Sequence, residues 1–478
     1  MKKITLLIVL IIIVFSCKET KSENQKNQIE KKQKTNFVVT DSLLNQAVIY
    51  EANIRQYSKK GDFNSFTKDI PQLKKLGIKI IWLMPIYPIS KVKRKATGDT
   101  FVEDIKNPEE RKKYLGSPYA VANYTAINPD FGDKKDLQQL IETAHKNGMA
   151  VILDWVANHT GWDNPWIKEH PEFYTKNKKG EITDPLNPDG TSKGWQDVAD
   201  LNYDNPELRK AMTQSMKYWI KNFNIDGFRC DVAGEVPVDF WKQAITELRQ
   251  EKPLFMLAEA WEPELLKDHI FDACYGWESH FLLADIAKGK KNVKDFDVYI
   301  KKTDSMYEPD DIIMNFTANH DENSWKGTEA ETFGKATETM EALTFMIPGM
   351  PLIYSGQEYG LNHRLKFFEK DSIPKTKGEK WQLYQKLGFL KNHYPALAGG
   401  KQKAKYQRIS TTADDKILAF KREKNGKILY FVGNLSNENQ KFNLDLKGLF
   451  TDKIQGKNIT FETDKPVELK AWEYYILE

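Results

Sequence analysis

The chain is poor in cysteine, with three among 478 residues. A small disulfide-stabilised fold is thereby excluded, because such frameworks need several cysteine pairs. An excess of charge of one sign is also absent, since 71 Lys+Arg stand against 67 Asp+Glu and the formal net charge is +4. No basic stripe interleaved with aromatic residues is present, so we expect no nucleic acid among its partners. Apolar residues make up 40% of the chain, which is enough for a large globular core and two or three domains.

Long apolar runs are scarce as well, and the one at the N-terminus, Ile4 to Phe15, follows two lysines. It is short for a bilayer-spanning helix, and its charged start and small-residue end are typical of a secretion signal. The stretch "VFSC" (14 to 17) resembles a bacterial lipobox, which implies lipidation of Cys17. Plain cleavage and an uncleaved anchor are the alternatives. We predict a signal peptide over 1–17, secretion across the inner membrane, and a membrane-anchored lipoprotein in the periplasm or at the cell surface.

Residues 18–35 are polar and contain too few apolar side chains to fold alone. We expect 18–43 to form a disordered tether between the membrane and a folded enzyme. The remaining cysteines, Cys230 and Cys274, lie in predicted strands, where a buried free thiol is the commoner state. We interpret both as packing residues, with an intramolecular pair as the alternative.

From residue 44 to about 400, short apolar runs alternate with longer amphipathic segments, a pattern typical of repeated βα units. Eight strands are predicted, at 47–50, 79–85, 150–156, 227–232, 254–259, 272–276, 312–318 and 351–356. Helices are predicted over 66–77, 134–148 and 205–223, and Gly77 and Gly148 serve as C-terminal stops. Eight such strands favour a closed (β/α)8 barrel.

Two connections, 87–133 and 159–205, are too long for simple barrel loops, and long loops in compact domains are usually functional. The second predicts a short inserted domain, about 160–204, after the third strand. Beyond 400 the sequence alternates as in a hairpin around Asn425-Gly426. The predicted fold is therefore α/β, a (β/α)8 barrel with an inserted domain and a C-terminal antiparallel β-domain, a β-sandwich over 401–478.

The stretch "GFRCDVA" (227 to 233) places Arg229 and Asp231 two residues apart in a strand that is otherwise small or apolar. Because strand side chains alternate, these two charges share one face. A structural ion pair is the alternative interpretation, since buried charges also mark structural networks. Polar residues likewise stand at the C-terminal ends of three further strands. They are Asp154, Asn158 and His159 after the third strand, Glu259 on the fifth, and His320 and Asp321 after the seventh.

In a (β/α)8 barrel these strand ends converge on one mouth, where such enzymes carry their catalytic residues. Like charges held close raise one another's pKa, and unpaired burial is costly, so a carboxylate cluster is a poor structural device. It suits glycosidic cleavage, which needs one carboxylate to attack and one carboxylic acid to protonate the leaving oxygen. The carboxylate cluster is therefore better explained by catalysis than by a structural role.

Four motifs, "DWVANH" (154 to 159), "GFRCDVA" (227 to 233), "AEAW" (258 to 261) and "FTANHD" (316 to 321), resemble the signature regions of the α-amylase superfamily of glycoside hydrolases, in the right order. The resemblance extends to "YEANIRQYS", "GIKIIWLMPIYPI", "SPYAVANYTAINPDFG", "PLIYSGQEYGL" and "FLKNHYPAL", and so to most of 47–398.

The resemblance implies a catalytic triad of Asp231 as nucleophile, Glu259 as general acid and base, and Asp321 as the carboxylate that stabilises the transition state. It also implies that Tyr119 stacks on the substrate, and that His159, Arg229 and His320 hydrogen-bond to the sugar. Asp154 takes a structural place in the active site. The tryptophans near the predicted mouth are as readily packing residues as sugar platforms. They are Trp162, Trp166, Trp195, Trp261 and Trp325.

Asn158 and Asp200 match side-chain ligands of the family's structural calcium, and oxygen ligands of this kind suit Ca²⁺. No organic cofactor is expected. The sequence departs from the family at Asn123, where aspartate is common, and at Gly234-Glu235, where a lysine-histidine pair is usual. The second departure weakens one of the family's usual contacts on the +2 side of the cleft, so the product pattern is expected to differ from that of other amylases.

The expected function is that of a retaining α-glycoside hydrolase of α-amylase type, acting on starch-like α-glucans or maltooligosaccharides, and the expected state is a monomer. The alternatives within the same site are an α-glucosidase, a neopullulanase and a glucanotransferase. A non-catalytic glycan-binding protein is disfavoured because all three carboxylates are present.

Overall fold

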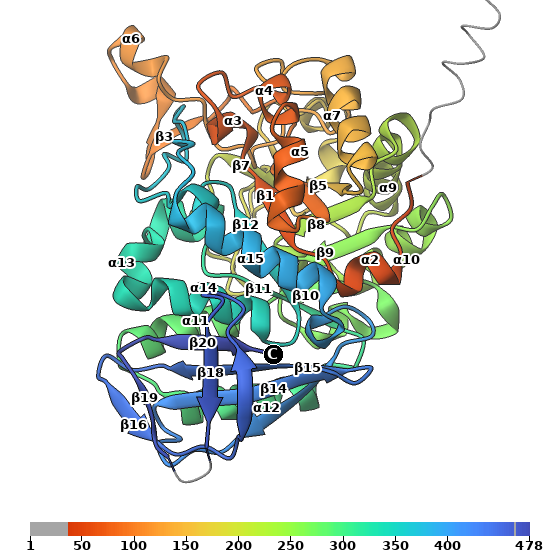
Figure 1. Cartoon of the computed structure of the whole chain (residues 1–478). Helices are drawn as coiled ribbons and strands as arrows, with labels where there is room; N and C mark the ends of the chain where they lie inside the picture. The colour runs from red at the N-terminus through yellow and green to blue at the C-terminus, as the bar shows by residue number, and fades with distance from the viewer. Residues whose placement is uncertain (1–36, 463–464) are drawn as a thin grey trace, which may run out of the picture. The chain divides into compact units, whose positions relative to one another are not determined.

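Eight parallel strands close into a barrel in the computed structural model, which describes residues 37–462 and 465–478 (Figure 1). The predicted signal peptide, Cys17 and most of the predicted tether lie outside the described residues. The barrel strands are β1 (Ile49–Ala52), β2 (Ile80–Leu83), β5 (Ala150–Val156), β8 (Gly227–Asp231), β9 (Phe255–Ala258), β10 (Ala273–Tyr275), β11 (Ile312–Asn315) and β12 (Met350–Tyr354). Every predicted strand is confirmed, and β1 closes the barrel by pairing with both β2 and β12.

These strands form where the sequence is almost continuously apolar, because both faces of a barrel strand are buried. All seven residues of β5 are buried, Asp154 among them. Helices surround the strands (Figure 1). The longer ones are α7 (Lys134–Lys146), α9 (Pro206–Phe223), α10 (Val238–Arg249), α11 (Trp277–Ala287), α12 (Val293–Met306), α14 (Thr337–Met346) and α15 (Glu379–His393). The shorter ones include α2 (Asp41–Asn45), α3 (Ile54–Tyr57) and α13 (Glu329–Phe333).

Two of the three predicted helices are confirmed as α7 and α9, which begin after the N-caps Asp133 and Asn205. Gly148 has φ 77°, the left-handed conformation that glycine favours after a helix. The prediction of one helix over 66–77 is wrong. That stretch divides into α4 (Phe63–Thr67), α5 (Ile70–Leu73) and a 3-10 turn, η1 (Lys74–Leu76). Pro71 explains the break, because proline inside a helix lacks the N–H and clashes with the preceding turn.

The two long connections both leave the C-terminal ends of strands and lie over the barrel mouth. The one after β2 contains a hairpin of β3 (Lys95–Thr97) and β4 (Thr100–Phe101), followed by α6 (Pro108–Arg111). The one after β5 is the predicted inserted domain. It contains β6 (His159–Gly161), α8 (Trp166–Glu169) and β7 (Val198–Asp200), and β6 pairs with β7 in antiparallel fashion.

The C-terminal region forms the expected antiparallel β-domain. Its main sheet has the order β13 (Lys405–Ile409), β14 (Ile417–Lys424), β15 (Lys427–Asn434) and β20 (Tyr474–Leu477). Two ribbons accompany it, β16 (Gln440–Phe442) with β19 (Val467–Leu469), and β17 (Gly448–Thr451) with β18 (Asn458–Phe461). The predicted hairpin turn at Asn425-Gly426 is present, with φ of 53° and 71° at its two residues.

The two faces of this sheet enter two different cores. Ile417 and Ala419 pack with the ribbons in a small separate cluster, whereas Leu418 and Phe420 belong to the large core that includes the barrel. This alternation follows from the two-residue period of a strand. The sheet therefore has one face on its own ribbons and the other face on the barrel.

Two fully buried basic side chains lie where the sheet joins the barrel. The Arg422 guanidinium on β14 donates to the carbonyl oxygens of Met346 (2.8 Å), Ala398 (3.1 Å) and Ala404 (3.3 Å). The Lys391 Nζ on α15 donates to carbonyls of Gly349 (2.8 Å) and Leu397 (2.6 Å), and burial lowers the pKa of Lys391 well below its usual value. Carbonyl groups that end helices and loops are thereby satisfied from the side chains of two other elements.

Candidate active site

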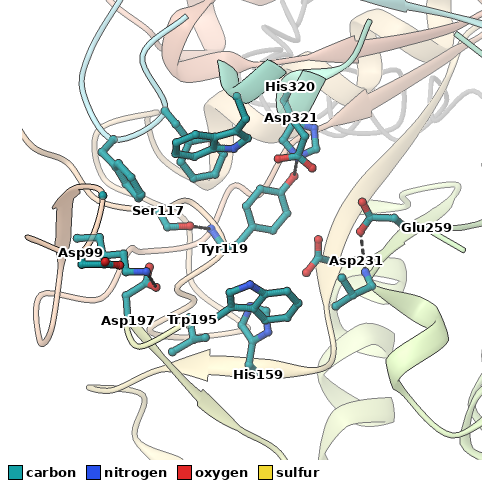
Figure 2. A pocket seen from close by; sticks show the side chains of 17 residues that line it. Asp99, Ser117, Tyr119, His159, Trp195, Asp197, Asp231, Glu259, His320 and Asp321 are labelled. Atoms are coloured by element: carbon teal, nitrogen blue, oxygen red, sulfur yellow. Dashed lines mark hydrogen bonds and ion pairs between the residues drawn. The ribbon is translucent and has the colours of Figure 1, made fainter. Parts of the chain in front are cut away.

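A cavity of about 420 Å³ lies at the C-terminal ends of the barrel strands. Six of the residues predicted to act on substrate line it (Figure 2), namely Tyr119, His159, Asp231, Glu259, His320 and Asp321. They come from the loop after β2 and from the ends of β5, β8, β9 and β11. The polar strand ends therefore converge on one mouth, as the sequence predicts.

Arg229 lies behind this cavity, fully buried, and contacts three carboxylates. Its Nη1 donates to Asp154 Oδ1 (2.9 Å) and to Asp231 Oδ1 (2.8 Å). Its Nη2 lies 2.8 Å from Glu259 Oε2 and forms an ion pair with it. The N–H bonds of Nη2 do not point at this oxygen, so the pair is not a hydrogen bond. Asp231 and Arg229 share a face of β8, as predicted, and one guanidinium thus holds two cavity carboxylates.

The residue after Asp231 turns the chain sharply. Val232 has φ 38° and ψ 46°, a left-handed conformation that is strained for a β-branched residue. Its backbone N–H donates to Glu259 Oε2 at 2.7 Å. The end of β8 is therefore fixed against the acidic side chain on β9 by backbone geometry as well as by Arg229.

Burial is the main cause that raises the pKa of Glu259 to about 7, and the neighbouring carboxylates Asp231 and Asp321 raise it further against the lowering effect of Arg229. Burial also raises the pKa of Asp231, to about 6, opposed by the Arg229 charge and assisted by Asp154. The two side chains thus differ in their readiness to keep a proton. Glu259 is the better acid donor near neutral pH and Asp231 the better anion.

A directed hydrogen-bond chain continues from Asp154 to the far side of the site. The Tyr119 hydroxyl donates to Asp154 Oδ2 (3.0 Å), and His320 Nε2 lies 2.7 Å from the same hydroxyl oxygen. Because Asp154 only accepts and Tyr119 has one proton, His320 Nε2 must be the donor to Tyr119. Trp82 Nε1 also donates to Asp154 Oδ2 (3.1 Å).

Glu51, at the third position of β1, holds the other nitrogen of His320. Its Oε1 lies 2.5 Å from His320 Nδ1, and its Oε2 is buried and has no hydrogen-bond partner in the structure. Burial alone lowers the pKa of His320, but the charges of Asp321 and Glu51 outweigh it and raise the pKa to about 9. The charges of Asp321 and Glu51 thus favour the cationic imidazole, in which Nδ1–H faces Glu51 and Nε2–H faces Tyr119.

Sequence reasoning missed Glu51, Trp82 and Tyr275, whose hydroxyl accepts from Arg229 Nε (3.0 Å). All three point into the barrel from strands that read as apolar runs. The only available signal was a carboxylate inside the apolar stretch "VIYEA" on β1.

Of the aromatic residues near the mouth, Trp195 and Trp325 line the cavity. Trp166 packs against Phe173 and the Trp162 indole donates to Gln196 O. Trp261 lines a separate groove beside α11 and α12. His159 is electrically neutral, because burial lowers its pKa to about 3.

The predicted calcium ligands lie at the base of the inserted domain. Asn158 directly precedes β6, and Asp200 ends β7 opposite His159. Asp200 is half-buried, and this burial raises the pKa of its carboxyl to about 6. These two oxygen donors fit a hard cation. Within 37–462 and 465–478, no three His, Cys, Asp or Glu side chains form a metal-binding group. The other ligands would thus be carbonyl oxygens or water.

Comparison with known proteins agrees with this geometry. The model of the α-amylase catalytic domain matches residues 20–187 and 191–389. Alpha-amylase 3 of Dictyoglomus thermophilum is 26% identical over 482 aligned residues, covering 87% of this chain and 88% of its own. A 4-alpha-glucanotransferase of Thermotoga neapolitana is 25% identical, covering 63% of this chain and 68% of its own.

Among solved structures, a noncanonic maltogenic α-amylase from Thermotoga neapolitana superposes with a TM-score of 0.78 at 29% identity. The superposition covers 91% of this chain and 98% of the other. Fold, barrel-mouth site and the match over most of the sequence agree, and the chain belongs to the α-amylase family of glycoside hydrolases.

Proposed function

We propose that the protein is a retaining α-glycoside hydrolase that cleaves starch-like α-glucans or maltooligosaccharides through a covalent glycosyl-Asp231 intermediate. The observation that carries the proposal is the position of Asp231 and Glu259 on adjacent strands, with both side chains on one guanidinium. Cys230 pairs with Ala258 between β8 and β9, so Asp231 and Glu259 are the next residues of the two strands. Parallel neighbours lie about 4.8 Å apart, which suits the roughly 5–5.5 Å spacing of a retaining pair.

Each step has a residue with suitable chemistry. Glu259, protonated near neutral pH, donates its proton to the glycosidic oxygen while the Asp231 carboxylate attacks the anomeric carbon. The leaving chain departs with that proton. Glu259, now ionised, takes a proton from water, and the resulting hydroxide attacks the anomeric carbon and releases Asp231. Asp321 adds negative charge near the positive charge that develops on the sugar.

The other cavity residues position the sugar. Tyr119 offers a ring for stacking, and its hydroxyl is fixed by Asp154 and His320. His159 and His320 present ring nitrogens at the cavity wall. Arg229 lies behind the carboxylates and not on the wall, so we assign it the role of keeping Asp231 ionised.

The test is a pair of variants, Asp231→Asn and Glu259→Gln, assayed on an aryl α-maltoside and on α-maltosyl fluoride. Asp231→Asn removes the nucleophile and should abolish hydrolysis of both substrates. Glu259→Gln should retain glycosylation by the fluoride, because fluoride leaves without protonation. Proton NMR of early wild-type hydrolysis should show the α-anomer first. Initial formation of the β-anomer would contradict the retaining assignment.

Transfer to a sugar acceptor is the second candidate function, because a relative that aligns over 63% of this chain is a 4-alpha-glucanotransferase. The same glycosyl intermediate serves both reactions, and access of the acceptor decides between them. Products longer than the substrate, formed from maltotriose, would favour transfer. A purely glycan-binding function is disfavoured because three carboxylates meet in one cavity.

We further propose that the chain is exported and anchored to a membrane through lipid on Cys17, as a lipoprotein of the periplasm or cell surface. The support is the charged start, the apolar run and the "VFSC" stretch. In the described part of the chain, no helix is long and apolar enough to cross a membrane.

We also propose a structural Ca²⁺ held by Asn158 and Asp200. It would join the inserted domain to the barrel and take no part in the chemistry, since the carboxylates form a complete acid and nucleophile pair without it. The half-buried Asp200 carboxylate at the end of β7 and the Asn158 side chain directly before β6 support this proposal.

A further inference from the structure

The cavity is bounded on one side by loops that are hydrogen-bonded to one another. Resting on the proposed function, we infer that this wall stops the non-reducing end of the substrate, so that the enzyme acts on chain ends and releases short units. Phe367, Phe368 and Trp325 are the residues that we assign to this specificity.

The orientation of the substrate follows from the acid. Glu259 must contact the glycosidic oxygen, so the leaving chain extends beyond Glu259. The part of the substrate that Asp231 attacks extends in the other direction, toward Tyr119. Figure 2 shows Glu259 and Asp99 at opposite ends of the cavity with Tyr119 between them. The Asp99 end therefore receives the non-reducing side of the substrate.

Two loops that are distant in sequence line this cavity with Ser117, Phe367 and Phe368 and are hydrogen-bonded to each other. The backbone N–H groups of Leu115 and Gly116 both donate to Phe368 O, at 2.7 and 3.2 Å, and Tyr114 forms a β-bridge with Glu369. The buried Arg55 side chain of α3 donates to Gly116 O (2.9 Å) and to Phe367 O. Because these bonds are mainly between backbone groups, the wall is part of the fold and not a side-chain arrangement that a substrate can displace.

Aromatic rings face the cavity from this wall. The Phe367 ring lies parallel to that of Tyr119, with centroids 6.3 Å apart and an interplanar angle of 8°. Trp325 lies 4.9 Å from Phe367 and is 48% exposed. Leu365 N–H donates to Asn323 Oδ1 (2.8 Å), which joins this loop to the turn that carries Trp325. The row of rings thus continues the Tyr119 platform and ends at the wall.

The hairpin of β3 and β4, whose tip carries Asp99, adds to the boundary at the Asp99 end. Lys95 donates to Gly194 O (2.9 Å) and lies 3.7 Å from Asp197, so the hairpin is fastened to the inserted domain. Gly98 and Asp99 at its tip line the cavity. Lys95, Asp99 and Asp197 offer charged partners for the extra hydroxyl groups of a terminal glucose.

The experiment compares two maltoheptaosides labelled at the reducing end with 4-nitrophenol. One has a free non-reducing glucose and the other carries a 4,6-ethylidene cap there. A chain-end enzyme should cleave the capped substrate at least 10-fold more slowly, and early products from the free substrate should be short and uniform. Equal rates with cleavage inside the chain would overturn the inference. Hydrolysis of 4-nitrophenyl α-maltoside tests the proposed function separately. If this substrate is not hydrolysed, both conclusions fail. If it is hydrolysed while the capped and free maltoheptaosides react at equal rates, only the chain-end inference fails.

A double variant, Trp325→Ala with Phe367→Ala, opens the wall and should bring the rate ratio of capped to free substrate toward one. The matched control is Phe389→Ala, an exposed aromatic on α15 that does not line the cavity. It should leave the ratio unchanged. An unchanged ratio in the double variant would remove these two rings from the specificity determinant, and the wild-type comparison stands even where the variant does not fold.

Discussion

The two carboxylates that contact Arg229 set the pH range of the reaction. Asp231 must be ionised, and activity is lost as pH falls through its pKa of about 6. Glu259 must be protonated, and activity is lost as pH rises through its pKa of about 7. We therefore predict a narrow bell-shaped profile of kcat/KM with its maximum between these values. For α-maltosyl fluoride, which needs no acid, glycosylation should lose the alkaline limb. An alkaline limb retained with the fluoride would contradict the assignment of Glu259.

Glu51 on β1 controls the pKa of His320. In Glu51→Gln the carboxylate charge that stabilises the His320 cation is removed, so the His320 pKa should fall from about 9 toward its ordinary value. Neutral His320 would then lose the Nε2 proton that it donates to Tyr119. We predict a loss in kcat/KM of about tenfold at pH 8, with a smaller loss at pH 5.5 where His320 is charged again.

The matched control is Glu358→Gln. Glu358 is also fully buried and accepts from the Tyr50 hydroxyl (2.6 Å), but it lies outside the His320 chain. Glu358→Gln should lower the stability of the fold. The ratio of its kcat/KM to that of wild type should be the same at pH 8 and at pH 5.5. Imidazole NMR of wild-type His320 provides a second readout, and an ordinary pKa there would contradict the role of Glu51.

The sequence predicted the carboxylates and histidines of the site because each stands in a motif at a strand end. It did not predict Glu51 and Tyr275, since one polar or aromatic residue in an apolar strand does not show which distant groups its side chain meets. Only barrel closure between β1 and β12 brings Glu51 near His320. Contacts that form only when the sheet closes into a barrel cannot be predicted from the sequence of one strand.

At the scale of elements, Gly388 sets the distance between α15 and η1. A Cβ at Gly388 would lie 2.0 Å from the backbone oxygen of Leu76. A backbone atom cannot move aside as the end of a flexible side chain can. Gly388→Ala gains about 1 kcal/mol of helix propensity, but the overpacking costs about 1–3 kcal/mol or more. We predict a lower urea midpoint. Gly378→Ala, at the N-cap of the same helix with open space around it, is the control and should change the midpoint little.

The inserted domain carries the calcium prediction. A chelator should lower the melting temperature if Ca²⁺ binds only the folded state, and added Ca²⁺ should restore it. Asp200→Asn should remove this response. Asp189→Asn, an exposed carboxylate in the same inserted segment, should retain it. Identical melting curves with and without chelator would show that no structural calcium is bound.

Element positions were predictable where apolar runs are bounded by turn residues, and all eight strands follow this rule. The helix over 66–77 was not, because its apolar spacing is helical while Pro71 interrupts the hydrogen bonds. The small strands of the inserted domain had no periodic signal, since three-residue strands such as β6 and β7 depend on their partner.

At the scale of the whole molecule, anchoring is the property to test. Cys17→Ala removes the thiol that would carry lipid and should move the protein from the membrane fraction to the soluble fraction, or block its processing. Cys274→Ala, a buried thiol within the barrel, is the control and should fractionate as wild type. A Cys17→Ala protein that matures and fractionates unchanged would contradict the lipoprotein proposal.

The barrel and its order of strands were predictable because alternating strands and helices favour few topologies. The attachment of the C-terminal sheet was not. Arg422 reads in sequence as one more charge on an exposed strand, and nothing local shows that carbonyls of three distant segments meet it.

That attachment makes the C-terminal sheet a poor candidate for exchange between enzymes. A chimera that grafts a foreign sheet after residue 404 would leave the carbonyls of Met346 and Ala398 without the Arg422 guanidinium. Each unsatisfied buried group costs about 1–3 kcal/mol. The large core would also lose Leu418 and Phe420, which lie on the sheet face that packs on the barrel. We therefore expect barrel and sheet to unfold as one cooperative unit, although the sequence pattern divides the chain into two modules.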